Sequence, residues 1–207
     1  FYFTVEPERK FELLLKLLDR EQPRQAIVFC RTKRGTDRIG ERLAKKLSQV
    51  ACMHGDMTQG ARDSVMRRFR DGELRYLVAT DVVGRGIDIS GISHIVNFDI
   101  PEFCDDYVHR VGRTGRMGRE GVAYTFVAPG EGPQLTRIEQ RIDRLLKRDT
   151  MVGFEAAKMA AESPADANLE GNANPSGESM GPDGEPPKPP PPASMQKRPQ
   201  KRYRRAL

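Results

Sequence analysis

Apolar positions along the first 150 residues follow two alternating patterns. Short runs rich in β-branched residues predict strands, and longer runs with apolar residues three or four apart predict helices. The expected strands cover residues 2–5, 26–30, 50–54, 76–80, 94–98 and 122–128. The expected helices cover residues 8–21, 35–48, 59–72, 102–111 and 134–148. Strand and helix therefore alternate throughout this part of the chain.

This alternation predicts an α/β fold with an open, mostly parallel sheet and helices on both faces, because parallel strands need crossover connections. Sheets of this kind bind their ligands at the carboxyl ends of the strands. The residues that follow the strands are therefore expected to carry the function. They are residues 31–34, 54–57, 80–88 and 99–102.

The composition changes beyond residue 150. Ten of the fifteen prolines lie after residue 160, and apolar side chains become scarce. Because so few apolar groups cannot offset the entropy of ordering, residues 151–196 are expected to form a disordered, acidic, proline-rich linker. Its KPPPP run at 188–192 favours a semi-rigid spacer, with a ligand for a proline-recognition module as the alternative. Residues 197–207 carry six cations and one tyrosine, which suits an RNA-binding tail.

Charge and cysteine usage narrow the class of protein. The net charge is +6, and residues 1–150 carry 27 Lys and Arg against 22 Asp and Glu. A mildly basic body with a basic tip predicts a polyanionic partner, most simply nucleic acid. Three cysteines without paired spacing predict reduced thiols in a cytoplasmic protein. No apolar stretch approaches the roughly 20 residues that span a bilayer, so no membrane partner is expected.

The stretch HRVGRTGRMGREG at 109–121 repeats arginine and glycine three residues apart. A collagen-like strand is excluded because the repeat stops after four glycines. A disordered arginine/glycine arm that binds RNA stays open, although strand-like residues 122–128 follow at once. The other interpretation is a turn or helix start that presents several guanidinium groups to phosphates.

Three strand-end stretches contain further candidate chemistry. RTKRGTD at 31–37 opens a helix, and helix amino termini bind phosphate through backbone amides. In HGDMTQGAR at 54–62, Gln59 and Arg62 share one helix face. In VATDVVGRGIDI at 78–89, a glycine-rich bend leads to Asp88, which is suited to accept hydrogen bonds from ribose hydroxyls. The alternative is that Asp81 and Asp88 only cap turns or neutralise neighbouring arginines.

These stretches, in this order, resemble the motifs of the second RecA-like domain of DEAD-box ATP-dependent RNA helicases, in helicase superfamily 2. IVFCRTK (27–33) is similar to motif IV, and Gln59 with Arg62 matches the QxxR motif. ATDVVGRGID (79–88) is similar to motif V, and HRVGRTGR (109–116) to motif VI. The resemblance covers roughly residues 1–150 and implies a helicase C-terminal domain there. One departure is Gly84, where the family commonly has alanine.

The resemblance implies an ATP site that is shared with another domain. Arg113 and Arg116 are expected to reach the γ-phosphate, with Arg116 as the preferred arginine finger. His109 is expected to contact the opposite domain and to couple ATP to RNA. Gly86 and Asp88 complete the expected ATP-binding residues, and Asp88 accepts from the ribose.

The resemblance also implies a surface that holds the RNA sugar–phosphate backbone without sequence preference. The residues expected there are Thr32, Gly55, Arg62 and Thr80. Three further residues, Arg110, Gln59 and Asp81, are interpreted either as part of the site or as structural pairs. Arg119 lies beyond the motif and is expected to be surface charge.

The sequence lacks a GxxxxGK[ST] loop and a carboxylate pair at an apolar strand end, which ATP hydrolysis requires. The chain alone is therefore expected to be inactive. The resemblance implies a preceding RecA-like domain that holds ATP with Mg²⁺, and residues 2–5 as the linker from it. The two domains together are expected to unwind short RNA duplexes. A stand-alone, non-catalytic RNA-binding module and a superfamily 2 DNA helicase are the alternatives.

Overall fold

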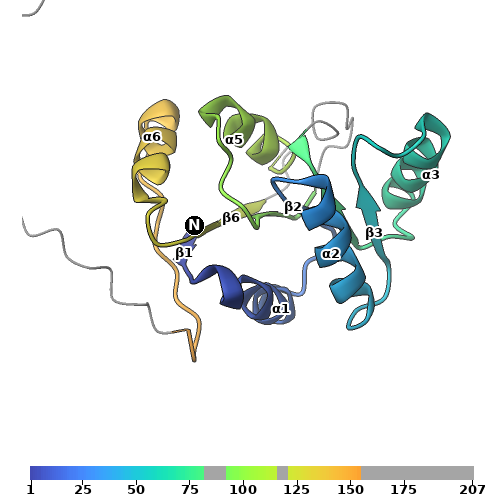
Figure 1. Ribbon diagram of the computed structural model, residues 1–207, viewed down its shortest axis with the longest axis horizontal. Helices are drawn as coiled ribbons and strands as arrows, with labels where there is room; N and C mark the ends of the chain where they lie inside the picture. The colour runs from blue at the N-terminus through green and yellow to red at the C-terminus, as the bar shows by residue number, and fades with distance from the viewer. Residues whose placement is uncertain (82–91, 116–120, 155–207) are drawn as a thin grey trace, which may run out of the picture. The chain divides into compact units, whose positions relative to one another are not determined.

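The computed structural model describes residues 1–81, 92–115 and 121–154. Its centre is a six-stranded sheet in the order β1-β6-β5-β2-β4-β3, and every pair of neighbouring strands is parallel (Figure 1). The strands are β1 (Tyr2–Thr4), β2 (Ala26–Phe29), β3 (Val50–Met53), β4 (Tyr76–Ala79), β5 (His94–Asn97) and β6 (Val122–Val127). The predicted α/β architecture is confirmed, and within the described residues the sheet is wholly parallel.

Helices cover both faces of this sheet. They are the short 3₁₀ helix η1 (Pro7–Arg9) and the α-helices α1 (Lys10–Glu21), α2 (Lys33–Ala44), α3 (Gln59–Arg70), α5 (Cys104–Val111) and α6 (Gly132–Ile142). In Figure 1, α1 lies on one side of the sheet, and α5 and α6 lie on the other. Each of the five α-helices within the described residues overlaps one predicted helix. The predicted helix 134–148 is too long, because Asp143 adopts a left-handed conformation that ends α6 at Ile142, and Arg148 instead forms a bridge with Tyr2.

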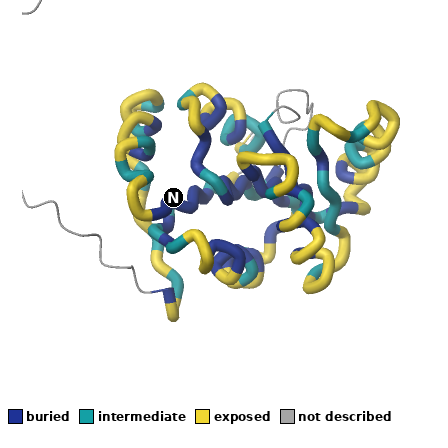
Figure 2. The backbone as a smooth tube through the Cα atoms, viewed as in Figure 1, coloured by how far each residue is buried: buried dark blue, intermediate teal, exposed yellow. Residues whose placement is uncertain are grey.

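Strand β2 shows how the two layers form, because its successive side chains point to opposite faces. Ala26 and Val28 pack with the leucines of α1 and with Ile39 of α2. Ile27 and Phe29 pack instead with Phe69 of α3. A third cluster joins α5 and α6 over the end of β6. Figure 2 accordingly shows a buried band through the middle of the molecule with exposed outer helix faces.

Local signals in the sequence set where α2 and α3 begin. Thr32 precedes α2, and its hydroxyl oxygen accepts a hydrogen bond from the Gly35 amide at 3.0 Å. Thr58 precedes α3 and accepts from the Ala61 amide at 3.3 Å. Such caps satisfy amides that the first turn of a helix leaves without partners. Both helices therefore start directly after the loops that leave β2 and β3.

The two ends of the described chain pack against the domain. β1 pairs with β6, with Tyr2 opposite Thr125, so the expected linker at residues 2–5 also forms an edge strand. After α6, Phe154 is buried in the cluster below α1, with the Arg9 guanidinium 4.2 Å from its ring centre. The proposed boundary at residue 150 remains a prediction, as do the disordered linker and the RNA-binding tail, which lie largely outside the described residues. No helix in the described ranges is long and apolar enough to cross a membrane.

A close helix–strand contact gives a prediction about stability. A Cβ atom added at Gly40 would lie 1.9 Å from Cys52 Sγ, which no relaxed structure tolerates, but 3.7 Å from Cys52 Cβ. We expect Gly40→Ala to lower the free energy of unfolding by about 1–3 kcal/mol through overpacking. In a Cys52→Ala background the same change should be neutral or stabilising by up to about 1 kcal/mol, because alanine favours the helix. Urea unfolding of the four proteins measures both effects, and equal losses in the two backgrounds would contradict this packing account.

Candidate functional site

Three strands of the sheet end at the same level, which brings the predicted RNA-binding residues to one edge. Phe29 of β2 and Met53 of β3 both pair with Ala79 of β4. The backbone continues this arrangement, because the amide of Cys30 donates to Ala79 and the amide of Thr80 donates to Met53. The loops that hold Thr32, Gly55 and Thr80 therefore leave adjacent strands at one carboxyl edge.

Contacts between side chains join two of these loops. The Lys33 ammonium after β2 pairs with the Asp56 carboxylate after β3, and this contact lowers the pKa of Asp56. His54 Nε2 lies 2.9 Å from Asp37 Oδ1 of α2. Thr32 and Gly55 are both exposed beside these contacts. The amino termini of α2 and α3, with their positive partial charge, thus flank an exposed surface.

The QxxR pair forms the first turn of α3. The Arg62 guanidinium donates to Gln59 Oε1 at 2.7 Å, and the Gln59 amide donates to Asp63 at 2.7 Å. Gln59 is thereby a structural partner of Arg62, whichever further role it has. Arg62 Nε is buried and has no hydrogen-bond partner among the described residues. One donor of this guanidinium is therefore held in place without an acceptor.

Thr80 has a similar position at the end of β4. The residue is 4% exposed, and its hydroxyl has no hydrogen-bond partner within the described parts of the chain. A buried hydroxyl without a partner costs free energy, so natural proteins rarely retain one without a compensating ligand or function. Thr80 and Arg62 thus provide two donors at the edge that the sequence assigns to RNA.

Arg110 of α5 is the most completely bonded side chain of the site. It is 2% exposed, and it donates to both carboxylate oxygens of Asp81 at 2.5 and 2.7 Å. It also donates to Asn97 Oδ1 at 3.0 Å and to the Asp99 carbonyl at 2.9 Å. Its guanidinium carbon lies 5.0 Å from the ring centre of Phe29. Of the two roles that the sequence left open, the structure shows pairing of Arg110 with Asp81.

A second charged cluster adjoins this pair. Asp99 accepts from the Arg31 amide at 3.0 Å and from the Lys10 ammonium at 3.4 Å. Glu131 accepts from the Arg31 guanidinium at 3.1 Å and lies 3.9 Å from Lys10. The sequence reasoning missed Lys10, Glu131 and the central Asn97. Two signals were present: a lysine on the leucine-lined face of α1, and an asparagine within the apolar run HIVNF.

The structure describes only some of the residues that are predicted to contact ATP. His109 is exposed on α5, and Arg113 is half-buried in the turn that follows this helix. The Arg113 amide donates to the Arg110 carbonyl at 3.2 Å, so the turn continues directly from the buried pair. Three predicted ATP-binding residues lie outside the described residues, namely Gly86, Asp88 and Arg116.

The buried pair predicts a loss of stability when its anion is removed. We expect Asp81→Asn to lower the free energy of unfolding by about 3 kcal/mol, because the Arg110 cation would stay buried without its counterion. The matched control is Asp63→Asn, which alters an exposed carboxylate and should change stability by less than about 0.5 kcal/mol. Urea unfolding measures both, and similar small losses would contradict a buried charge pair.

Known proteins and protein families resemble this chain in sequence. Residues 9–118 match the model of the helicase conserved C-terminal domain. The chain is 49% identical over 148 residues to the DEAD-box ATP-dependent RNA helicase CshA of Bacillus cereus, covering 72% of this chain and 28% of that protein. CshA of Geobacillus kaustophilus is also 49% identical, with 32% of its length covered.

Solved structures of DEAD-box proteins also resemble this chain. The E. coli DEAD-box protein SrmB, bound to regulator of ribonuclease activity A, has a TM-score of 0.70 and 32% identity over 80% of this chain and 96% of that chain. A DEAD box protein from Methanococcus jannaschii has a TM-score of 0.66 and 34% identity, covering 72% of this chain and 41% of that one. The matched part of the chain spans 28–32% of the length of these curated relatives. The predicted resemblance is confirmed: the chain belongs to the helicase conserved C-terminal domain family, and its described residues have the RecA-like fold of DEAD-box C-terminal domains.

Proposed function

We propose that this domain binds the RNA backbone and supplies arginine side chains to ATP held by a preceding RecA-like domain, so that the whole protein unwinds short RNA duplexes. The observation that carries the proposal is the pair of donors without partners at the carboxyl edge. Thr80 Oγ1 and Arg62 Nε are both buried and have no acceptor in the described ranges. A polyanion that reaches this edge supplies the missing acceptors.

The rest of the edge suits a sugar–phosphate backbone. The exposed hydroxyl of Thr32 already accepts from Gly35, and its proton remains able to bond a phosphate oxygen. The starts of α2 and α3 add the positive ends of two helix dipoles. Contacts of this kind position a strand without reading bases, which gives binding without sequence preference. A related protein, S. cerevisiae Dbp5, has been solved with RNA and ADP BeF3, at 31% identity and a TM-score of 0.66.

The arginine residues that are proposed to contact ATP follow α5 in the sequence. Arg113 leaves the helix beside the buried Arg110, and Arg116 follows three residues later. Positive charge placed there would stabilise the negative charge that spreads over the γ-phosphate oxygens during transfer. Gly86 and Asp88 are proposed to bind the nucleotide, with Asp88 accepting from the ribose. We assign Mg²⁺ to the preceding domain, as the resemblance to DEAD-box helicases implies.

Arg110 supports communication between the two ligands. Its guanidinium contacts Asp81, which directly follows Thr80, while its own helix carries His109 and leads into Arg113. We propose that ATP and RNA together favour a closed arrangement of the two domains in which one RNA strand is bent and cannot remain paired. Hydrolysis then favours the open arrangement, as expected when ligands shift a two-state equilibrium. The cytoplasmic location of the protein stays a prediction.

The RNA surface predicts a specific change in salt dependence. We expect Arg62→Ala to weaken binding of single-stranded RNA and to reduce the slope of log affinity against log salt by about 0.7, the value for one lost phosphate contact. Fluorescence anisotropy at several salt concentrations measures this slope. Arg68→Ala is the control, because Arg68 lies on the same helix and pairs with Glu73. Equal slopes for the two variants would remove Arg62 from the RNA surface.

The ATP site predicts a selective loss of turnover. In the full protein that contains this domain, Arg116→Ala should lower RNA-stimulated ATP hydrolysis by about a thousandfold, the typical effect of a lost arginine finger, with RNA affinity largely unchanged. Arg119→Ala removes a nearby arginine beyond the motif and should leave turnover near normal. Coupled-enzyme ATPase assays measure both variants. Near-normal turnover of Arg116→Ala would reject its assignment.

A further inference from the structure

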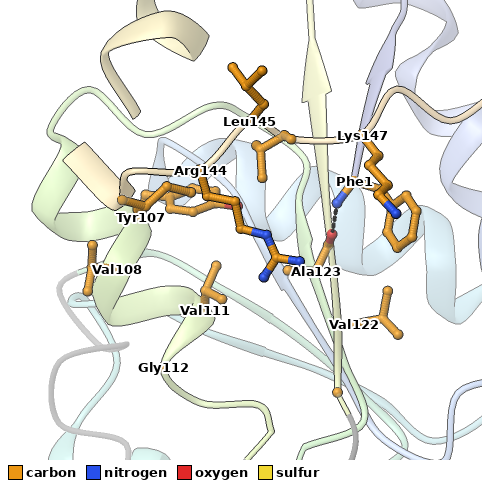
Figure 3. Close-up of a pocket in the computed structure, with 13 residues that line it drawn as sticks. Phe1, Tyr107, Val108, Val111, Gly112, Val122, Ala123, Arg144, Leu145 and Lys147 are labelled. Carbon is orange, nitrogen blue, oxygen red and sulfur yellow. Dashed lines mark hydrogen bonds between the residues drawn. The ribbon is translucent and has the colours of Figure 1, made fainter. Parts of the chain in front are cut away.

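A groove of about 570 Å³ lies apart from the carboxyl edge of the sheet. One wall is formed by Val108 and Val111 of α5 with Gly112 directly after the helix, and the opposite wall is the start of β6 (Figure 3). The segment after α6 crosses between them with Arg144, Leu145 and Lys147. Its volume falls in the range of sites that enclose a ligand or a few side chains of a partner.

Exposed apolar side chains line two sides of the groove. Val108 of α5 is 41% exposed, and Leu145 in the segment after α6 is 80% exposed. Single exposed apolar residues are ordinary, but a contiguous concave group is typical of a binding surface. Burying these side chains under a partner would release water and stabilise a complex.

Charge restricts the class of partner. Arg144 and Lys147 are both exposed beside the groove, and neither has a carboxylate within 4.0 Å among the described residues. Lys and Arg on this rim therefore remain available to an anionic partner. Apolar walls with a cationic rim are complementary to a peptide that combines an apolar side chain with neighbouring carboxylates.

From these features we propose that the groove binds an acidic peptide segment of a partner protein, with one apolar side chain inserted between Val108 and Leu145. The proposal goes beyond RNA and ATP binding and does not depend on either. It has a consequence for α5, because Val108 and Val111 lie three residues apart on one face of this helix. A peptide bound there contacts the helix that also carries His109 and Arg110. A partner protein could therefore influence the proposed ATP contacts through α5.

A selection experiment tests the proposal on the purified 207-residue chain. A displayed library of random 12-residue peptides is selected for binding, and the enriched peptides are synthesised and measured by anisotropy. We expect the enriched sequences to share a large apolar residue next to at least two carboxylates. Failure to enrich any sequence, or enrichment of sequences without carboxylates, would overturn the proposal.

Matched variants locate the binding site. Leu145→Asp should weaken the selected peptides about tenfold, the ratio that follows from losing the contact of one buried leucine. Val152→Asp is the control, because Val152 is 95% exposed and does not line the groove, and it should leave the affinity unchanged. Both substitutions are on the surface, so folding is expected to be preserved. Equal affinity of the two variants would place the peptide elsewhere and reject the groove.

The charge contribution is tested separately. The double variant Arg144→Glu with Lys147→Glu should weaken the same peptides about tenfold or more, and the loss should shrink as salt is raised. The double variant Lys45→Glu with Lys46→Glu has the same net charge and alters exposed lysines after α2, so it should bind as the parent chain does. Equal losses in the two double variants would show nonspecific attraction to net charge and overturn the proposal.

Discussion

One guanidinium group, that of Arg110, links the parts of this domain on which the proposed activity depends. It is buried on α5, yet it donates to the Asp81 carboxylate after β4, to the side-chain oxygen of Asn97 on β5 and to the Asp99 carbonyl beyond β5. Desolvating a cation is costly, so the arrangement is stable only when all of these acceptors are correctly placed. The position of α5 over the sheet and the path of the chain after Thr80 are consequently fixed by the same contacts.

The charged cluster around Asp99 extends this constraint to the first strand end. Its carboxylate accepts from the Arg31 amide next to Thr32, and its carbonyl accepts from Arg110. Lys10 of α1 supplies a nearly buried cation beneath it. Arg31 of motif IV, Asp81 of motif V and Arg110 of motif VI are thereby joined by a short series of hydrogen bonds through Asp99. Ligands at the proposed RNA-binding edge and at α5 would thus act on a common set of polar contacts.

The sequence predicted the fold because its strands are apolar and β-branched while its helices have apolar faces, and these periods alone distinguish the two elements. It also predicted the strand ends as the site, since a parallel sheet places them at one edge. It did not predict Lys10 or Glu131 as members of the site, because they are distant in sequence and meet only when α1 and the start of α6 pack on the sheet. The sequence left a pairing role for Arg110 and Asp81 open beside a role in the site, but it could not choose between them, since a motif shows spacing but not the direction in which a side chain points.

The pairing of β1 with β6 has a consequence for the way the domain is made. Tyr2 meets Thr125 in the sheet, so the first strand waits for its partner until more than a hundred further residues have been synthesised. Until β6 has been synthesised, β1 has no neighbouring strand to pair with, and the apolar side chain of Phe3 on β1 cannot be buried against β6. Contacts between such distant residues slow folding and leave apolar surface exposed during translation. β1 is therefore expected to enter the sheet late, once β6 has been synthesised.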